Sequence, residues 1–351
     1  MPRLERQYRD LSVPIREFTF TVNLPEAGTR LDLALRAHFP WRSREHFQGM
    51  IDRGDVTVGG IVRKASVRLQ EGDRVAVAIP IPADAPEKES ADGLVILYED
   101  DALVAIDKPS GVVAHPTGRI RHGTLINRLH ARYRRNVPDG AKPVRTSRAE
   151  RASEKDVVPR LAHRLDKDTS GIVLVVKDRR LDALVTRAFF RREVKKTYLA
   201  LVDGDPVVAG GIIDRPIGPA PDAQTLLEMA VREDGQPART RWRVLERFGR
   251  FAFLELNPET GRTHQLRVHL RSIGHPIVAD HLYGDLRPLR TSTFSPGVPD
   301  ADDEVLLARL ALHAHRLELA HPGTGRPLVL ESALPPDFER ALATLRATVE
   351  S

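Results

Sequence analysis

Hydrophobic residues in the first part of the chain follow helical spacing first and strand spacing afterwards. Apolar residues recur three or four positions apart over 31–38 and again over 47–51, which predicts two short helices, the second capped by Ser43. Residues 56–58 and 61–62 then flank the pair Gly59-Gly60, and large and small apolar residues alternate over 75–79, which predicts small strands joined by tight turns. We therefore expect a module of two helices and a small sheet.

From Leu94 onward, short apolar runs outnumber the helical segments. Helical spacing is visible over 181–192 and over 336–349. The apolar runs cover residues 94–98, 102–106, 172–176, 198–202 and 251–256. This pattern predicts an α+β fold for the large C-terminal part, built on a mostly antiparallel, mixed β-sheet with flanking helices.

Composition along the chain predicts where these parts begin and end. Residues 1–16 are polar and are expected to form a flexible arm, followed by the small module over 17–80. Residues 81–93 are rich in proline and charge, as is typical of a linker. The large domain then covers 94–351, and its segment 133–158 is a loop full of Pro, Arg, Lys and Ser.

Length and composition are those of a globular protein with two domains. The chain has 351 residues, 41% of them hydrophobic. It contains no cysteine, which excludes disulfides, thiolate catalysis and cysteine zinc sites and fits a reducing compartment. The polar N-terminus lacks the apolar stretch of a signal peptide, and no run approaches the roughly 20 apolar residues of a membrane span. We expect a cytoplasmic protein without a membrane partner, and a monomer is the default state.

The positive charge is concentrated in one segment. The whole chain carries +6, with a pI of about 9.7. Residues 119–164 contain 13 Lys and Arg against 4 Asp and Glu, a net charge of +9, which leaves −3 for the rest. Such an asymmetry favours a polyanionic substrate that is steered to one place.

The segment 160–171 carries the most informative chemistry. It holds the acid Asp166, the base Arg164 and a Ser-Gly turn, and an apolar run follows directly. Burial at the mouth of a strand would disfavour a charged carboxylate, and a neighbouring arginine would restore the charge. A carboxylate kept ionised in this way is a candidate nucleophile. The alternative is a structural carboxylate that pairs with Arg164 or caps the turn at Thr169.

The same segment also satisfies a second enzymatic pattern. Asp166, Asp168 and Thr169 fit the D-x-D-x-T pattern of aspartate-nucleophile phosphatases. That pattern needs an apolar strand directly before the first aspartate, whereas here the apolar run comes after it. No downstream acidic pair is well placed for magnesium, so a phosphatase is only a remote alternative.

Two further clusters carry candidate chemistry. Tyr198 lies in an apolar run behind two lysines, where the alternative is an ordinary amphipathic core tyrosine. Arg262 and Arg267 lie at a predicted turn-to-helix entry, and their guanidinium groups suit phosphate or carboxylate partners. His264 and His269 are five positions apart and have no carboxylate companion, so we expect no metal site.

The small module contains several short motifs: Arg30-Leu31-Asp32, Ser43-Arg44, the 51–60 segment with Gly54, Val56, Val58 and Gly60, and Gly72-Asp73-x-Val75. With these motifs it resembles the α-L RNA-binding module named after ribosomal protein S-four of the small subunit. The turn reads Gly59-Gly60 where the family usually has Asn-Gly, and both satisfy a type I′ turn. The resemblance implies an RNA-docking surface, for which we name Arg42, Arg44, Arg53 and Lys64; a dimerisation or packing module is the alternative.

Six sequence blocks are spread over nearly the whole second domain. The most specific block is His163-Arg164-Leu165-Asp166-x-x-Thr169-Ser170-Gly171. Further blocks in register are Asp107-Lys108-Pro109-Ser110-Gly111, Lys196-x-Tyr198-x-Ala200-Leu201, Gly261-Arg262-Thr263-His264-Gln265-Leu266-Arg267, Asp280-x-x-Tyr283-Gly284 and Leu312-His313-Ala314. Through these blocks the larger part of the chain resembles the RluA-type family of pseudouridine synthases. An N-terminal α-L module fused to this domain is the arrangement of members that act on ribosomal RNA.

The resemblance implies a role for each residue of the site. Asp166 matches the catalytic aspartate, and Arg267 matches the arginine that forms an ion pair with it in a dry pocket. Tyr198 matches the tyrosine that packs on the target base and moves a proton late in the reaction. Arg164 matches the residue that fills the gap left by the extruded uridine, and His163 is expected to position that loop.

Other expectations concern the substrate. Thr169, Arg262 and His264 complete the candidate RNA-binding residues. The reaction is an isomerisation, so no cofactor is expected. The implied substrate is structured RNA, with large-subunit ribosomal RNA first and transfer RNA second; a non-catalytic RNA-binding or ribosome-assembly factor is the other reading. The basic insertion 133–158 either contacts the RNA backbone or is a solvated loop.

Overall fold

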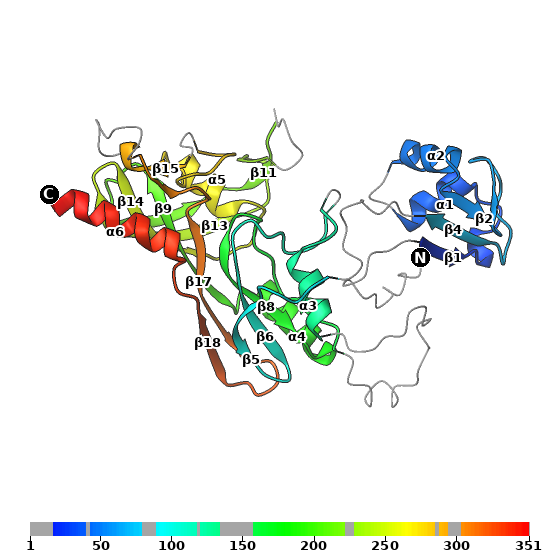
Figure 1. Cartoon of the computed structure of the whole chain (residues 1–351), viewed down its shortest axis with the longest axis horizontal. Coiled ribbons are helices and arrows are strands. Elements are labelled where there is room, and N and C mark those ends of the chain that lie inside the picture. The colour runs from blue at the N-terminus through cyan, green and yellow to red at the C-terminus, as the bar shows by residue number, and fades with distance from the viewer. Residues whose placement is uncertain are drawn as a thin grey trace. The chain divides into compact units, whose positions relative to one another are not determined.

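A computed structural model describes residues 17–39, 43–78, 89–117, 120–133, 157–221, 228–284, 288–293 and 303–350. The chain forms two compact units that divide between Lys88 and Glu89 (Figure 1, where the smaller unit is blue). The expected arm 1–16, most of the insertion 133–158 and the candidate residue Arg42 lie outside the described residues.

The smaller unit is a four-stranded antiparallel sheet with two helices. Its elements are β1 (Glu17–Thr21), a short 3-10 turn (Leu24–Glu26), α1 (Leu31–His38), α2 (Arg44–Asp52), β2 (Val56–Val58), β3 (Ile61–Val62) and β4 (Arg74–Ala78). The strand order is β1-β4-β2-β3. Ser43 caps α2 by accepting the N–H of His46 at 3.2 Å, as predicted. Gly59 and Gly60 both have positive φ, so the predicted type I′ turn between β2 and β3 is confirmed.

The larger unit is built on a ten-stranded sheet. Its main path is β10-β13-β14-β9-β17-β8-β6-β5, with β18 paired to β17 and β7 to β8. These strands are β5 (Val95–Glu99), β6 (Leu103–Lys108), β7 (Arg160–Leu161), β8 (Ser170–Val176), β9 (Lys195–Asp203), β10 (Gly210–Asp214), β13 (Arg239–Phe248), β14 (Phe251–Pro258), β17 (Leu312–Ala320) and β18 (Pro327–Glu331). The β17–β8 pairing is parallel and the others are antiparallel. The predicted mixed, mostly antiparallel α+β fold is confirmed.

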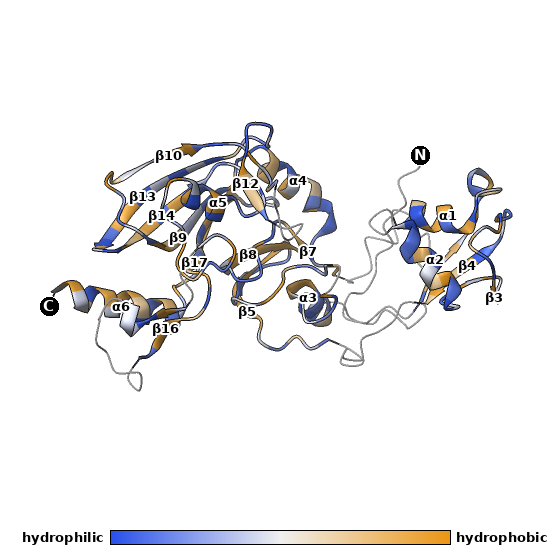
Figure 2. Cartoon of the chain, turned by 90° about the horizontal axis from the view of Figure 1, so that it is seen from above, coloured by the Kyte–Doolittle hydropathy of each residue, from blue (hydrophilic) through white to orange (hydrophobic). Residues whose placement is uncertain are grey.

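Helices and two small ribbons complete the larger unit. The helices are α3 (Leu125–Tyr133), α4 (Arg179–Phe190), α5 (Gln265–Ser272) and α6 (Pro336–Glu350), and a 3-10 turn covers Thr291–Thr293. The ribbons are β11 (Ile217–Pro219) with β12 (Met229–Val231), and β15 (Leu289–Arg290) with β16 (Val305–Leu307). Figure 2 shows both hydrophobic and hydrophilic residues along the helices, as expected where one side packs on a core. No helix among the described residues is long and apolar enough to cross a membrane.

Strand β8 explains why the central apolar run does not alternate with polar residues. All seven of its residues are buried, because both faces of the strand are covered. On one face Ile172 and Leu174 share a core with Val185 of α4. On the other face Val173 packs in a separate core with Leu129 of α3. The strand that follows Asp166 is therefore fixed from two sides, and the loop before it starts from a rigid base.

At the start of β8, the backbone of the neighbouring strand approaches too closely for a side chain. Gly171 has a φ of 108°, and a Cβ added there would lie 2.7 Å from the nitrogen of Ala314 in β17. Only glycine fits this parallel contact without moving a strand. Ser170 and Gly171 thus let β8 and β17 meet directly behind the Asp166 loop.

We predict that Gly171→Ala lowers the free energy of unfolding by more than about 2 kcal/mol, since it combines a disfavoured φ with a backbone clash. Gly249→Ala is the matched control, because Gly249 also has a positive φ, of 68°, but no atom within 4 Å of an added Cβ. Urea denaturation of both variants measures the difference. An equal loss of unfolding free energy in the two variants would show that the close approach of β17 does not destabilise Gly171→Ala.

Candidate active site

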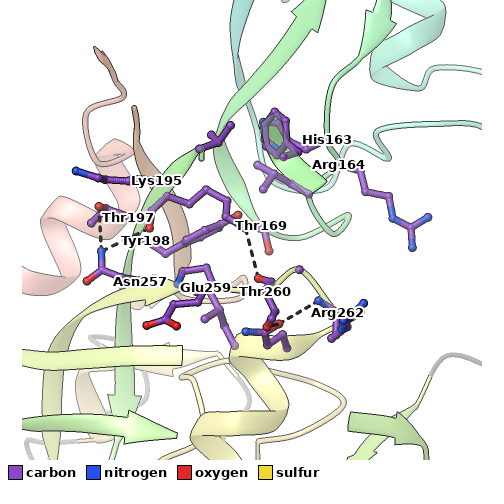
Figure 3. Close-up of a pocket in the computed structure, with 18 of the residues that line it drawn as sticks. His163, Arg164, Thr169, Lys195, Thr197, Tyr198, Asn257, Glu259, Thr260 and Arg262 are labelled. Atoms are coloured by element: carbon purple, nitrogen blue, oxygen red, sulfur yellow. Dashed lines mark hydrogen bonds between the residues drawn. The ribbon is translucent and has the colours of Figure 1, made fainter. Parts of the chain in front are cut away.

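The Asp166 loop opens into a cavity of about 1100 Å³ in the larger unit. The walls come from the loop before β8, the end of α4, the start of β9, and the segment that joins β14 to α5. Figure 3 labels residues from the loop, from β9 and from the β14–α5 segment. Seven Lys or Arg side chains line the cavity against three Asp or Glu. A predominantly cationic cavity of this size suits a polyanionic ligand.

Asp166 lies opposite Arg267, as predicted. Nη1 of Arg267 is 3.5 Å from Oδ2 of Asp166, although the two residues are far apart in the sequence. The Arg267 side chain is only 5% exposed, whereas that of Asp166 is 33% exposed. The expected ion pair is therefore confirmed. The expectation of a dry surrounding holds for the arginine only, because the carboxylate faces the open cavity.

The closest partner of Arg267 is another acid. Nε and Nη2 of Arg267 donate to the two carboxylate oxygens of Asp280, both at 2.7 Å. Asp280 is fully buried and also accepts the backbone N–H groups of Leu282 and Tyr283. Burial alone would raise the pKa of Asp280, but the bonds from Arg267 and these N–H groups hold it below its ordinary value. The bidentate pair fixes the guanidinium and leaves Nη1 for Asp166.

His264 lies on the other side of the Asp166 carboxylate. Its Nε2 is 4.0 Å from Oδ2 of Asp166, and its Nδ1 is 2.7 Å from the hydroxyl of Tyr283. That hydroxyl accepts the N–H of Met229 and can donate its own proton to Nδ1. This network assigns the proton of neutral His264 to Nε2, the nitrogen that faces Asp166. Burial lowers the pKa of His264, although the nearby Asp166 charge opposes that shift.

Tyr198 enters the cavity from β9. Burial, together with the charge of Asp166, raises the pKa of Tyr198, so the phenol keeps its proton. Lys196 on the same strand donates to the carbonyl of Thr260 at 3.3 Å, and burial lowers its pKa. Thr197 receives a bond from the side-chain amide of Asn257 (Figure 3). Strand β9 and the β14–α5 segment are thereby joined along one wall of the cavity.

Arg164 and His163 are neighbours with different surroundings. Arg164 is exposed at the cavity, and Figure 3 shows it extending away from Tyr198. His163 stacks on Phe189 of α4 at 5.1 Å, and its Nε2 accepts the N–H of Leu174 at 3.1 Å. Burial lowers the pKa of His163 to about 3, so the ring stays neutral. His163 therefore fastens the loop to β8, while Arg164 is available to a ligand.

Lys108 holds the backbone of the Asp166 loop by hydrogen bonds. It was not among the predicted site residues. It is fully buried, and its Nζ donates to the carbonyls of Pro109, Val112 and Lys167 at 2.9–3.0 Å. Burial lowers the pKa of Lys108 to about 8, against the opposing charges of Asp168 and Asp166. Its bond to Lys167 fixes the backbone next to Asp166. The sequence signal was the block that begins at Asp107, although nothing in that block indicates which carbonyls the lysine reaches.

The remaining predicted residues have mixed environments. Thr169 is buried in the cavity wall, and its N–H reaches the carbonyl of Asp166 at 3.3 Å. Arg262 also lines the cavity, and its Nε donates to the carbonyl of Pro237.

Among the described residues, no group of three or more His, Asp or Glu lies close enough to hold a metal ion.

In the smaller unit, two of the residues predicted to contact RNA form ion pairs with carboxylates of the same unit. Arg44 donates to the fully buried Asp32 at 2.8 Å, beside Arg30, whose hydrogen bonds are the main reason that the pKa of Asp32 is lowered. Arg53 pairs with Asp55 at 3.0 Å. Lys64 is exposed, without a partner among the described residues. Arg44 therefore has a structural task that the sequence interpretation missed.

Comparisons with known proteins agree with this arrangement. A family model described as RNA pseudouridylate synthase matches residues 102–272, and one described as the S4 domain matches residues 29–75. The chain belongs to the RNA pseudouridine synthase family, in its RluA-type branch with an N-terminal S4 domain, and is thus an RNA-binding isomerase.

Individual relatives cover most of the chain. It is 40% identical to ribosomal large subunit pseudouridine synthase D of Nitrosomonas europaea over 94% of this chain and 89% of that protein. It is 36% identical to the protein of the same name in Xanthomonas campestris, over 91% and 90%. Among solved structures, human RNA Pseudouridylate Synthase Domain Containing 4 matches with a TM-score of 0.52 and 31% identity, over 72% of this chain and 92% of that one.

We predict that Arg267→Met lowers the free energy of unfolding by about 3–5 kcal/mol, because it leaves the charge of Asp280 buried and unpaired. Adding Asp280→Asn should restore at least about 1 kcal/mol, since an amide oxygen still accepts the N–H groups of Leu282 and Tyr283 without a charge. Urea denaturation of the wild type, both single variants and the double variant measures the coupling energy between the two side chains. Additive losses would show that the two side chains are not coupled.

The neutral, partly buried ring of His163 predicts that the stability of the protein falls in acid. The unfolded histidine takes up a proton near its ordinary pKa of 6.5, whereas the folded ring stays neutral down to about 3. Its contribution to stability is present above pH 6.5 and is lost as the pH falls from 6.5 toward 3. Between pH 7 and pH 5 this loss is about 1–2 kcal/mol.

The variant His163→Gln tests this linkage, because glutamine offers an uncharged acceptor to the N–H of Leu174. We expect the loss of stability between pH 7 and pH 5, from urea denaturation, to be smaller in the variant by that amount. An unchanged pH dependence would show that His163 is protonated in the folded protein.

Proposed function

We propose that this RNA pseudouridine synthase modifies large-subunit ribosomal RNA and that Asp166 is its catalytic residue. The observation that carries the proposal is the contact of Asp166 with Arg267 in a cationic cavity open to solvent. The relatives named above support the choice of RNA, because both carry the name of a ribosomal large subunit enzyme.

The chemistry explains why one carboxylate in such a cavity suffices. In the isomerisation, the bond between the ribose C1′ and N1 of uracil breaks, and a bond between C1′ and C5 forms. The C5 proton leaves to solvent and N1 gains a proton, so atoms balance without an oxidant, a reductant or a second substrate. A carboxylate that contacts the ribose assists the first step, and Arg267 keeps it charged and aimed at the cavity.

The other residues take positions that fit a flipped nucleotide. A uridine within structured RNA must leave its stack to reach Asp166. We assign Tyr198 to pack on the extruded base, and its raised pKa suits a group that keeps its proton until late in the reaction. We assign Arg164 to the gap in the RNA, because it is exposed beside the loop and has no carboxylate partner among the described residues.

The test is release of tritium from a large-subunit ribosomal RNA transcript that carries uridine tritiated at C5. Asp166→Asn should lower the rate at least about thousandfold, since it removes the reacting group, while RNA affinity stays within a few-fold. Asp168→Asn, two positions along the same turn, is the matched control and should stay within about fivefold of wild type. Wild-type release by Asp166→Asn would overturn the assignment.

A second substrate decides the choice of RNA. Transfer RNA labelled in the same way should release tritium much more slowly than the ribosomal transcript. Release from transfer RNA alone would overturn the proposed substrate and leave the role of Asp166 intact.

A further inference from the structure

Helix α4 ends at the cavity with two phenylalanines whose surroundings differ. Phe189 is partly buried and stacks on His163. Phe190, the last residue of the helix, is 87% exposed and still lines the cavity that holds Asp166. Among the phenylalanines, tyrosines and tryptophans that the structure describes, Phe190 alone is exposed.

The fold does not need a phenyl ring at this position. The side of α4 that packs on the sheet consists of Leu181, Val185, Ala188 and Phe189, at the spacing of one helix face. Phe190 falls outside this face and belongs to none of the hydrophobic cores. Phe190 is therefore free of a packing role and, because it lines the cationic cavity, its ring is available to a ligand there.

The groups around Phe190 are those of a nucleic-acid groove. Arg192 and Lys195 follow it along the chain, are exposed, line the same cavity and have no carboxylate partner among the described residues. Arg192 adopts a left-handed φ of 62°, which is uncommon for a residue with a side chain. An exposed aromatic ring next to unpaired cations is the combination that binds single-stranded RNA, by stacking on bases and neutralising phosphates.

We propose that Phe190 stacks on an unpaired nucleobase of the substrate strand next to the target uridine, while Arg192 and Lys195 contact the flanking phosphates. This rests on the proposed function, because it presumes that RNA enters the cavity. Phe190 is then a positioning residue that contributes to RNA affinity and does not touch the reacting atoms.

The first experiment separates affinity from chemistry. Phe190→Ala should weaken the Kd for the ribosomal transcript by at least about fivefold, the smallest effect expected for loss of one stacked base. The single-turnover rate constant at saturating RNA should fall less than threefold. Leu184→Ala on the same helix is the control, because Leu184 is 45% exposed and does not line the cavity, and it should bind as wild type.

The second experiment detects the stack itself. Phe190→Trp should retain RNA affinity, and its added fluorescence should be quenched when the transcript binds, whereas Leu184→Trp should show no quenching beyond that of the parent protein. Unchanged affinity in Phe190→Ala, or no quenching in Phe190→Trp, would overturn the proposal even if the wild type isomerises uridine. If the wild type binds the transcript but isomerises no RNA, the proposed function fails, and these two readouts still decide the stacking contact.

Discussion

The bidentate ion pair between Arg267 and Asp280 is the interaction on which the site depends. A buried guanidinium is costly unless its hydrogen bonds are satisfied, and Asp280 satisfies two of its nitrogens at 2.7 Å. The same pair leaves Nη1 at 3.5 Å from Asp166 in the open cavity. Asp280 thus sets the direction of the arginine, and the arginine sets the electrostatic surroundings of the carboxylate that faces the open cavity.

The rest of the larger unit holds Asp166 against this fixed guanidinium. Strand β8 is packed from both faces, and Gly171 lets β17 lie directly against its first residues. Lys108 donates to the carbonyl of Lys167 in the loop, and His163 accepts the N–H of Leu174 in β8. Arg164 and Phe190 take no part in these supports and stay exposed at the cavity, where we propose that they contact RNA. The cavity thereby has two parts: the supported loop that carries Asp166, and an exposed edge with cationic and aromatic side chains.

The sequence predicted the parts of the site that have a local or family pattern. The apolar run after Asp166 predicted a buried strand, and the family blocks around Tyr198 and Arg267 predicted the residues that lie close to Asp166. Asp280 stood in one of the family blocks, but its pairing with Arg267 was not predicted, and neither were the carbonyls that Lys108 reaches. Such long-range pairs and backbone acceptors leave no periodic signal in the sequence. Arg44 was interpreted as an RNA contact, since nothing local indicates that Asp32, 12 positions away, is buried and holds it.

The most direct test of this account is the single-turnover rate constant of the double variant Arg267→Met, Asp280→Asn, with Asp280→Asn alone as the reference and saturating ribosomal RNA transcript as the substrate. The double variant removes the guanidinium without leaving a buried charge, so the fold persists while Asp166 loses its partner. The account predicts a rate at least about a hundredfold below that of Asp280→Asn. A rate within threefold of the reference would contradict it, because Asp166 would then act without Arg267.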